Sequence, residues 1–90
     1  MALLSRNDLQ YHYNWKEYDS NDPKVSGDID NTSFNRAQGN EVLFLINKIA
    51  EKHNITNRSI GLRIEIMINE DLPGEIQTQE EVRLWIKSNW

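Results

Sequence analysis

The sequence predicts a mainly α-helical fold, in the form of a small three-helix domain with an extended N-terminal arm. Apolar residues recur at helical spacing in residues 42–50, which is typical of an amphipathic helix. A Thr-x-x-Glu capping box at Thr78 and Glu81 precedes a second such stretch. The first 39 residues offer no more than a helical turn around Phe34 and Ala37, and residues 17–32 are rich in Asp, Asn and Ser, which favours an arm and a loop.

A chain of 90 residues is expected to form a single domain, with the arm and an acidic loop in 1–39 and a helical core in 40–90. Cysteine is absent, which excludes disulfides and a thiol nucleophile. The apolar runs are far shorter than the roughly 20 residues of a membrane span. No export signal is visible, so we expect a cytoplasmic location. The His, Asp and Glu residues show no catalytic or metal-ligand spacing, and we predict a non-enzyme without metal or cofactor.

Aromatic and polar residues alternate in the N-terminal arm, where Tyr11, Tyr13 and Trp15 are the aromatic positions. This period of two is typical of a half-buried strand or an extended arm. A long loop over residues 17–32, rich in Asp, Asn, Ser, Pro and Gly, follows. Aromatic side chains dominate the energetics of protein interfaces. We therefore predict Tyr11, Tyr13 and Trp15 as protein-binding residues, with a role in the core as the alternative.

The first helix is predicted over residues 40–53. Apolar residues follow Val42 at i+3, i+4 and i+7, while charged residues face elsewhere, so the helix has one buried stripe. Asn54 is placed to end it in the left-handed conformation, with Ile55 packing back onto the preceding turn.

The segment from Ile60 to Asn69 fits two patterns. Apolar residues alternate along it and many are β-branched, which favours a strand. As a helix, it still places Ile60 and Ile64 on one face. We prefer a helix over residues 57–71, because only the arm could pair with such a strand and an isolated two-stranded sheet is marginal. The alternative is an α+β fold with Ile60–Asn69 as a strand.

The third helix is predicted over residues 79–89. The capping box fixes its start, and Val82, Trp85 and Ile86 lie at i, i+3 and i+4 on one face.

Ala50, Asn54, Thr56 and Ile60 follow one another at a spacing that resembles the helix-turn-helix of LacI-type bacterial repressors. In that family a small residue lets two helices approach and a Gly-like position makes the turn. A hydroxyl residue then caps the second helix, and apolar residues hold it against the first. The resemblance covers Ile49 to Ile64 and implies that Ala50, Asn54, Thr56 and Ile60 fill these roles.

The resemblance also implies three DNA-binding residues near the front of the second helix, namely Asn57, Arg58 and Arg63. Residues 41–63 contain four basic and two acidic residues, whereas residues 64–90 contain two basic and six acidic ones. Phosphate contacts depend on Lys and Arg, so the acidic C-terminal part disfavours nucleic acid as the partner.

We therefore predict a small non-enzymatic protein-binding or regulatory module of bacterial or phage type. Its partner is an unknown protein or a second copy of the chain. The alternative is a helix-turn-helix DNA-binding transcriptional regulator, with nucleic acid as the less favoured partner. No membrane partner is expected.

Overall fold

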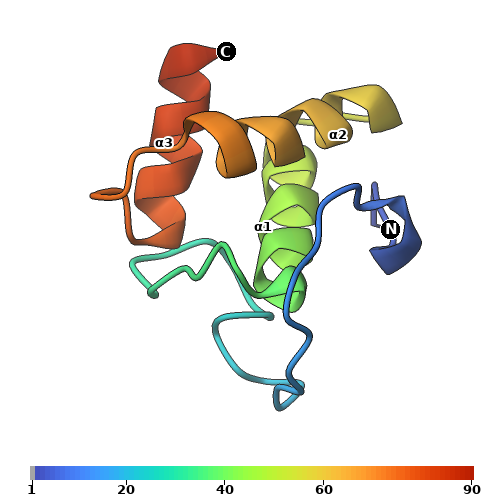
Figure 1. Cartoon of the computed structure of the whole chain (residues 1–90), viewed down its shortest axis with the longest axis vertical. Coiled ribbons are helices and arrows are strands. Elements are labelled where there is room, and N and C mark those ends of the chain that lie inside the picture. Colours follow the sequence, from blue (N-terminus) through green and yellow to red (C-terminus); the bar gives the residue numbers. More distant parts are fainter. Residues whose placement is uncertain (1) are drawn as a thin grey trace.

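The computed structural model describes residues 2–90, in which three α-helices enclose a common core (Figure 1). Helix α1 spans Gly39–Lys52, α2 spans Arg58–Ile66 and α3 spans Gln79–Asn89. In Figure 1, α2 lies across one end of α1, and the N-terminal segment and α3 flank α1 on opposite sides. The mainly α-helical fold predicted from the sequence is confirmed.

The hydrophobic core draws on both halves of the chain. Ile29 and Leu4 of the irregular N-terminal half are buried together with the helical residues. The buried apolar residues of the helices and of the turns that follow them are Val42, Leu45, Ile46, Ile49, Ile64, Met67, Ile68, Leu72, Val82 and Ile86. The described N-terminal residues, 2–38, are therefore part of the packed domain.

Helix α1 begins at Gly39, one residue earlier than predicted. A Cβ atom at this position would lie 2.6 Å from Cη2 of Trp15, so glycine lets the indole ring pack directly on the backbone. The Gly39 amide donates to the Asn14 carbonyl at 2.8 Å, and the Asn14 amide donates to the Ala37 carbonyl at 2.8 Å. The arm therefore runs beside the start of α1.

The turn after α1 ends the helix as the sequence predicts. Asn54 adopts the left-handed conformation with φ 55°, and the Ile55 amide donates to the Ala50 carbonyl at 2.8 Å. The next helix is capped by Asn57, whose side-chain oxygen accepts from the Ser59 amide at 2.9 Å. The capping residue is thus Asn57, where the resemblance to the repressors implied Thr56.

The segment from Ile60 to Asn69 is helical, so the alternative α+β fold is wrong. Helix α2 continues into a π-helical turn, η2 (Met67–Asp71), in which the Leu72 amide reaches back to the Met67 carbonyl at 3.0 Å. Ile64 and Ile68 are buried, but Ile66 between them is 47 % exposed. A strand would have placed these three on one face, whereas a period of 3.6 separates Ile66 from the other two.

Helix α3 begins at the predicted capping box. The Glu81 amide donates to Oγ1 of Thr78 at 3.2 Å, and the Thr78 amide donates to Oε1 of Glu81 at 3.1 Å. Val82 and Ile86 are buried, and Trp85 is half-buried against them.

The N-terminal half has little regular structure. A short 3-10 turn, η1 (Arg6–Asp8), opens it, and isolated bridges join Asn14 to Gln38 and Ser33 to Thr78. This matches the predicted extended arm and loop.

Candidate functional site

The three aromatic residues of the arm point toward the helices. Tyr11 donates its hydroxyl to Oε2 of Glu70 at 2.7 Å, and Tyr13 donates its hydroxyl to Oε2 of Glu65 at 2.7 Å. Trp15 packs on Gly39 and meets the Tyr13 ring edge-on, with 6.1 Å between the ring centroids. Each of the three predicted protein-binding residues is half-buried, and all lie on the inner side of the arm.

Glu65 of α2 is the main anchor of the arm. Its side chain is fully buried, and its two carboxylate oxygens each accept from the Gln10 amide at 3.0 Å. The Tyr11 amide donates to it at 3.3 Å, in addition to the Tyr13 hydroxyl. Hydrogen bonds to a charged acceptor are stronger than neutral ones, so this carboxylate fixes the path of the arm. Sequence reasoning missed this role. The available signal was the position of Glu65 beside buried Ile64.

Glu41 of α1 anchors the loop in the same way. The side chain is buried and accepts from the Tyr18 hydroxyl at 2.5 Å and from the Asn35 amide at 3.0 Å. Sequence reasoning missed this residue too. Glu41 lies four residues before buried Leu45, on the same stripe of the helix.

The three tyrosines remain neutral donors over a wide pH range. The hydrogen bond to Glu70 is the main cause that raises the pKa of Tyr11, to about 12. Burial, and then the hydrogen bond to Glu65, raises the pKa of Tyr13 well above its usual value. Burial and the hydrogen bond to Glu41 do the same to the pKa of Tyr18. Each phenol therefore stays protonated and remains a hydrogen-bond donor to its glutamate.

The predicted DNA-binding residues lie on different sides of α2. Asn57 caps the helix, Arg58 pairs with Asp8 of the arm, and the guanidinium of Arg63 stacks over the Trp90 ring at 4.6 Å. Arg63 lies five positions after Arg58, which places the two arginines roughly 140° apart around the helix axis. The structure therefore does not bring the two arginines together.

The arm also covers the face of α2 that carries Gly61 and Glu65. A Cβ on Gly61 would lie 2.8 Å from Cδ2 of Leu3 and 3.2 Å from Cδ1 of Leu4. Glu65, one turn further along, is covered by residues 10–13 of the arm.

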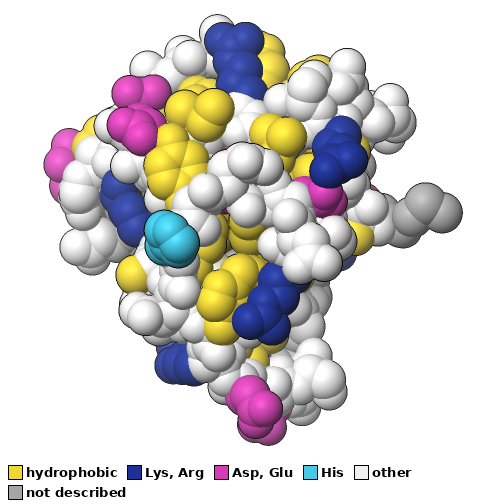
Figure 2. Space-filling view, turned by 45° about the vertical axis from the view of Figure 1, so that its right-hand side comes forward, with side chains coloured by type: hydrophobic (Ala, Val, Ile, Leu, Met, Phe, Trp, Pro, Cys, Tyr) yellow, Lys and Arg dark blue, Asp and Glu magenta, His cyan; other side chains and the backbone are white. Residues whose placement is uncertain are grey.

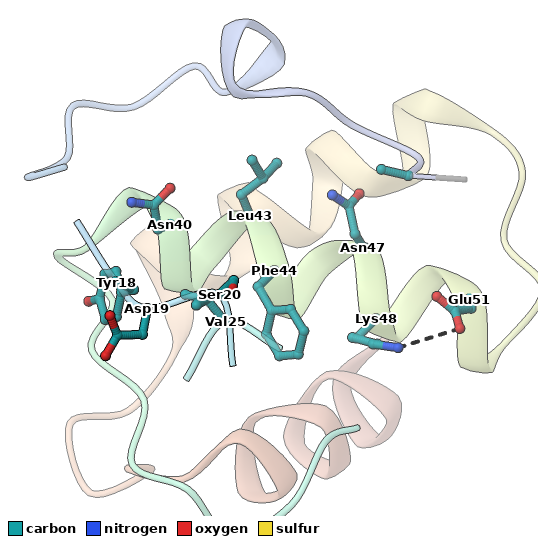
Figure 3. A pocket seen from close by; sticks show the side chains of 11 residues that line it. Tyr18, Asp19, Ser20, Val25, Asn40, Leu43, Phe44, Asn47, Lys48 and Glu51 are labelled. Carbon is teal, nitrogen blue, oxygen red and sulfur yellow. Dashed lines mark hydrogen bonds and ion pairs between the residues drawn. The ribbon is translucent and has the colours of Figure 1, made fainter. Parts of the chain in front are cut away.

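A hollow of about 470 Å³ lies along the outer face of α1, which we call the α1 hollow (Figure 3). Leu43 and Phe44 project from the helix between Asn40 and Asn47, while Lys48 reaches Glu51 at 3.5 Å. The loop around Tyr18 to Val25 forms its other side. The lining mixes polar and apolar groups and both signs of charge, so this hollow favours no single chemistry.

A smaller hollow of about 240 Å³, which we call the C-terminal groove, lies between the end of α1, α2 and α3. Its floor consists of Ile49, Ile55, Ile64 and Ile86. Trp90 forms one wall and is 51 % exposed. This groove is far more apolar than the α1 hollow.

The rim of the C-terminal groove is basic. His53, Arg83 and Lys87 line it, and Arg63 stacks on the outer wall formed by Trp90. Arg83 also binds Glu80 through two hydrogen bonds of 2.5 and 3.0 Å, which leaves Lys87 and Arg63 as the more available charges.

On the face drawn in Figure 2, charged side chains are dispersed. Figure 2 shows a face on which single basic and acidic side chains are scattered among apolar and neutral ones. Dedicated nucleic-acid binders instead cluster Lys and Arg on one face.

Other classes of site were also sought in the described residues. Among residues 2–90, no three His, Asp or Glu side chains come together as metal ligands. Within the same part of the chain, none of the helices combines the length and apolar character needed to cross a bilayer. Comparisons with protein-family models, with curated proteins and with solved structures gave no match.

Proposed function

We propose that this chain is a small non-enzymatic protein-binding or regulatory module of bacterial or phage type that acts in the cytoplasm. The observation that carries the proposal is the C-terminal groove, with four isoleucines on its floor and a half-exposed tryptophan as its wall. An apolar pocket beside an exposed aromatic residue suits an apolar anchor side chain of a partner protein.

The residues around the groove have the composition of an interface hot spot. Trp and Arg are the residue types most enriched among such hot spots, and here Arg63 stacks on Trp90. The stack restricts the ring that a partner would contact, and ordering a side chain before binding lowers the entropic cost of binding. The floor is formed by the packed ends of α1, α2 and α3, so the pocket exists before the partner arrives.

A pull-down from native lysate tests this proposal. We expect the intact chain to retain a defined protein, and Trp90→Ala to lose it. Leu84→Ala is the matched control, because Leu84 is 47 % exposed on the same helix and does not line the groove. Circular dichroism checks that both variants are folded. Equal retention by the two variants would exclude the groove as the binding site.

Tyr11, Tyr13 and Trp15 offer a second surface for the same function. Each keeps a half-exposed side chain, although their hydroxyl and ring contacts already hold the arm against α1 and α2. A partner that binds the arm would be lost on Tyr13→Ala or Trp15→Ala and kept by Trp90→Ala. The reverse pattern identifies the C-terminal groove.

Binding to DNA is the alternative function. The left-handed turn at Asn54, the buried Ala50 between the helices and the exposed positions of Asn57 and Arg58 support it. The pairing of Arg58 with Asp8 weighs against it, because it places a carboxylate where a phosphate would approach. The arm also covers α2 around Glu65, so DNA could not contact that part of the helix.

Titration of nonspecific duplex DNA at several salt concentrations tests this alternative. A DNA-binding chain should lose affinity steeply with salt, and Arg58→Ala should reduce the slope by about one. Absence of binding at low salt would rule the alternative out.

A further inference from the structure

We propose that the C-terminal groove binds an acidic segment of a partner protein, anchored by an apolar side chain on the isoleucine floor. This inference rests on the proposed protein-binding function and adds the chemistry of the partner. It is carried by the contrast between the floor of the groove, its rim and the charge of the chain as a whole.

The floor fixes the anchor. The floor has one isoleucine from each helix and one from the turn between α1 and α2, namely Ile49, Ile64, Ile86 and Ile55. These side chains leave a space of about 240 Å³. A water molecule takes up about 30 Å³ of liquid, so the space can admit one apolar side chain with its surrounding solvent expelled. Trp90 closes one wall and would gain contact with the same side chain.

The rim fixes the charge of the flanking residues. Within the described residues, the ionisable side chains that line the groove are His53, Arg83 and Lys87, all of them basic. The chain as a whole has a formal net charge of −4, so a local basic rim differs from the average surface. An acidic segment meets a net negative charge on the molecule as a whole and basic side chains at this groove, which favours its encounter and orientation there.

Arg63 adds a third Lys or Arg side chain beside Arg83 and Lys87, and it lies above the indole of Trp90 at 4.6 Å from the ring centroid. A carboxylate placed beside the anchor can contact this guanidinium without breaking the stack, because the edge of the guanidinium carries the donors. Arg83 is partly neutralised by Glu80, so Lys87 and Arg63 supply the main attraction.

Selection of peptides on the intact chain tests the proposal. A random 12-residue phage library is panned on the immobilised protein, and the enriched peptides are expected to combine Asp or Glu with Leu, Phe or Trp. One such peptide, fluorescently labelled, is then titrated with the chain. Replacing its Asp and Glu by Asn and Gln should weaken binding about tenfold at low salt, with a smaller effect at high salt.

Variants of the chain locate the site. Lys87→Glu should weaken binding of the acidic peptide by about tenfold. Lys16→Glu, which makes the same charge change on an exposed arm residue, should change the affinity much less. Trp90→Ala should abolish binding of both the acidic peptide and its neutral counterpart, in which Asn and Gln replace Asp and Glu.

The outcomes separate the two proposals. If the neutral peptides with Asn and Gln bind as tightly as the acidic ones and still require Trp90, the proposal of an acidic partner is wrong, and the proposed protein-binding function remains. Peptides that bind Trp90→Ala unchanged would overturn the groove as the site. A chain that is dimeric in solution and becomes monomeric on Lys87→Glu would replace the partner segment by a second copy.

Discussion

Two buried glutamates organise the contacts of this protein at the scale of single residues. Glu65 and Glu41 each accept a tyrosine hydroxyl and at least one backbone amide from the irregular half of the chain. A buried carboxylate is costly unless its oxygens are satisfied. Here the arm and the loop supply the donors. Detachment of either segment would therefore leave a glutamate carboxylate without its hydrogen bonds.

Replacing Glu65 by glutamine tests this anchoring. The variant loses the charge that strengthens the bonds from Gln10 and Tyr13, and it places an amide donor against the Gln10 amide. We expect the free energy of unfolding to fall by roughly 2 kcal/mol in urea titration. Glu75→Gln, an exposed position with the same change in charge, is the control and should shift stability by less than about 0.5 kcal/mol. Equal stability of the two variants would contradict the anchoring role.

Gly39 provides a second prediction at this scale. A methyl group there would meet the Trp15 ring at 2.6 Å from Cη2, so Gly39→Ala must displace the ring or the arm. We expect a loss of about 1–3 kcal/mol from overpacking, with a shift in tryptophan fluorescence. Gly74→Ala is the control, because a Cβ there meets nothing within 4 Å. A Gly39→Ala variant as stable as the control would mean that Trp15 packs elsewhere in solution.

At the scale of elements, the helices were predictable because their signals are local. The stripe that begins at Val42, the left-handed Asn54 and the Thr78–Glu81 box each act within a few residues, and each lies where the sequence predicts. Alternation in the segment after Ile60 also suggested a strand. The helix was preferred because only the arm could pair with such a strand, and an isolated two-stranded sheet is marginal. The structure agrees, since Ile66 is exposed while Ile64 is buried.

The candidate site was less predictable, because its residues come from distant parts of the chain. The C-terminal groove joins Ile49, Ile64 and Trp90, and no pattern in the sequence links them. Its basic rim likewise depends on how α3 is placed beside the end of α1. The alternation of the arm aromatics predicted that they share one side, but neither the inward direction of that side nor the partners Glu65 and Glu70 followed from it.

Asn54 gives the prediction that belongs to this scale, since it sets the angle between α1 and α2. Its φ of 55° is a conformation that glycine adopts freely and alanine does not. We expect Asn54→Ala to lower stability by about 1 kcal/mol and Asn54→Gly to leave it unchanged or slightly raised, as measured by thermal unfolding. His53→Ala, one residue earlier and at a negative φ, is the control. The opposite order of alanine and glycine at position 54 would show that the turn relaxes in solution.

At the scale of the whole molecule, polar side chains tie the irregular half to the helices through backbone groups. Asn47 of α1 both accepts from the Leu4 amide at 2.8 Å and donates to its carbonyl at 3.1 Å. Arg36 donates to the carbonyls of Ile68, Leu72 and Pro73 at the end of η2. These bonds serve in place of a sheet, because a segment without a regular ladder must find partners for its backbone elsewhere.

Three tyrosine hydroxyls also bind the irregular half to glutamates of the helices, and they make the stability of the whole domain sensitive to alkaline pH. Tyr11, Tyr13 and Tyr18 all have a raised pKa in the folded chain, with Tyr11 at about 12. In the unfolded chain each phenol has its ordinary pKa of about 10. Their contribution to stability is therefore fully present below about pH 10 and is lost as the pH rises toward the folded-state values.

We expect the phenolate absorbance of the folded chain to rise later than that of the chain in urea, and circular dichroism to show unfolding over the same alkaline range. Tyr13→Phe should remove one late-titrating phenol, leaving Tyr11 and Tyr18. It also deprives Glu65 of a hydrogen bond, so unfolding should begin at lower pH. Phenols that titrate near pH 10 in the native chain would show that the arm and the loop are not held against the carboxylates in solution.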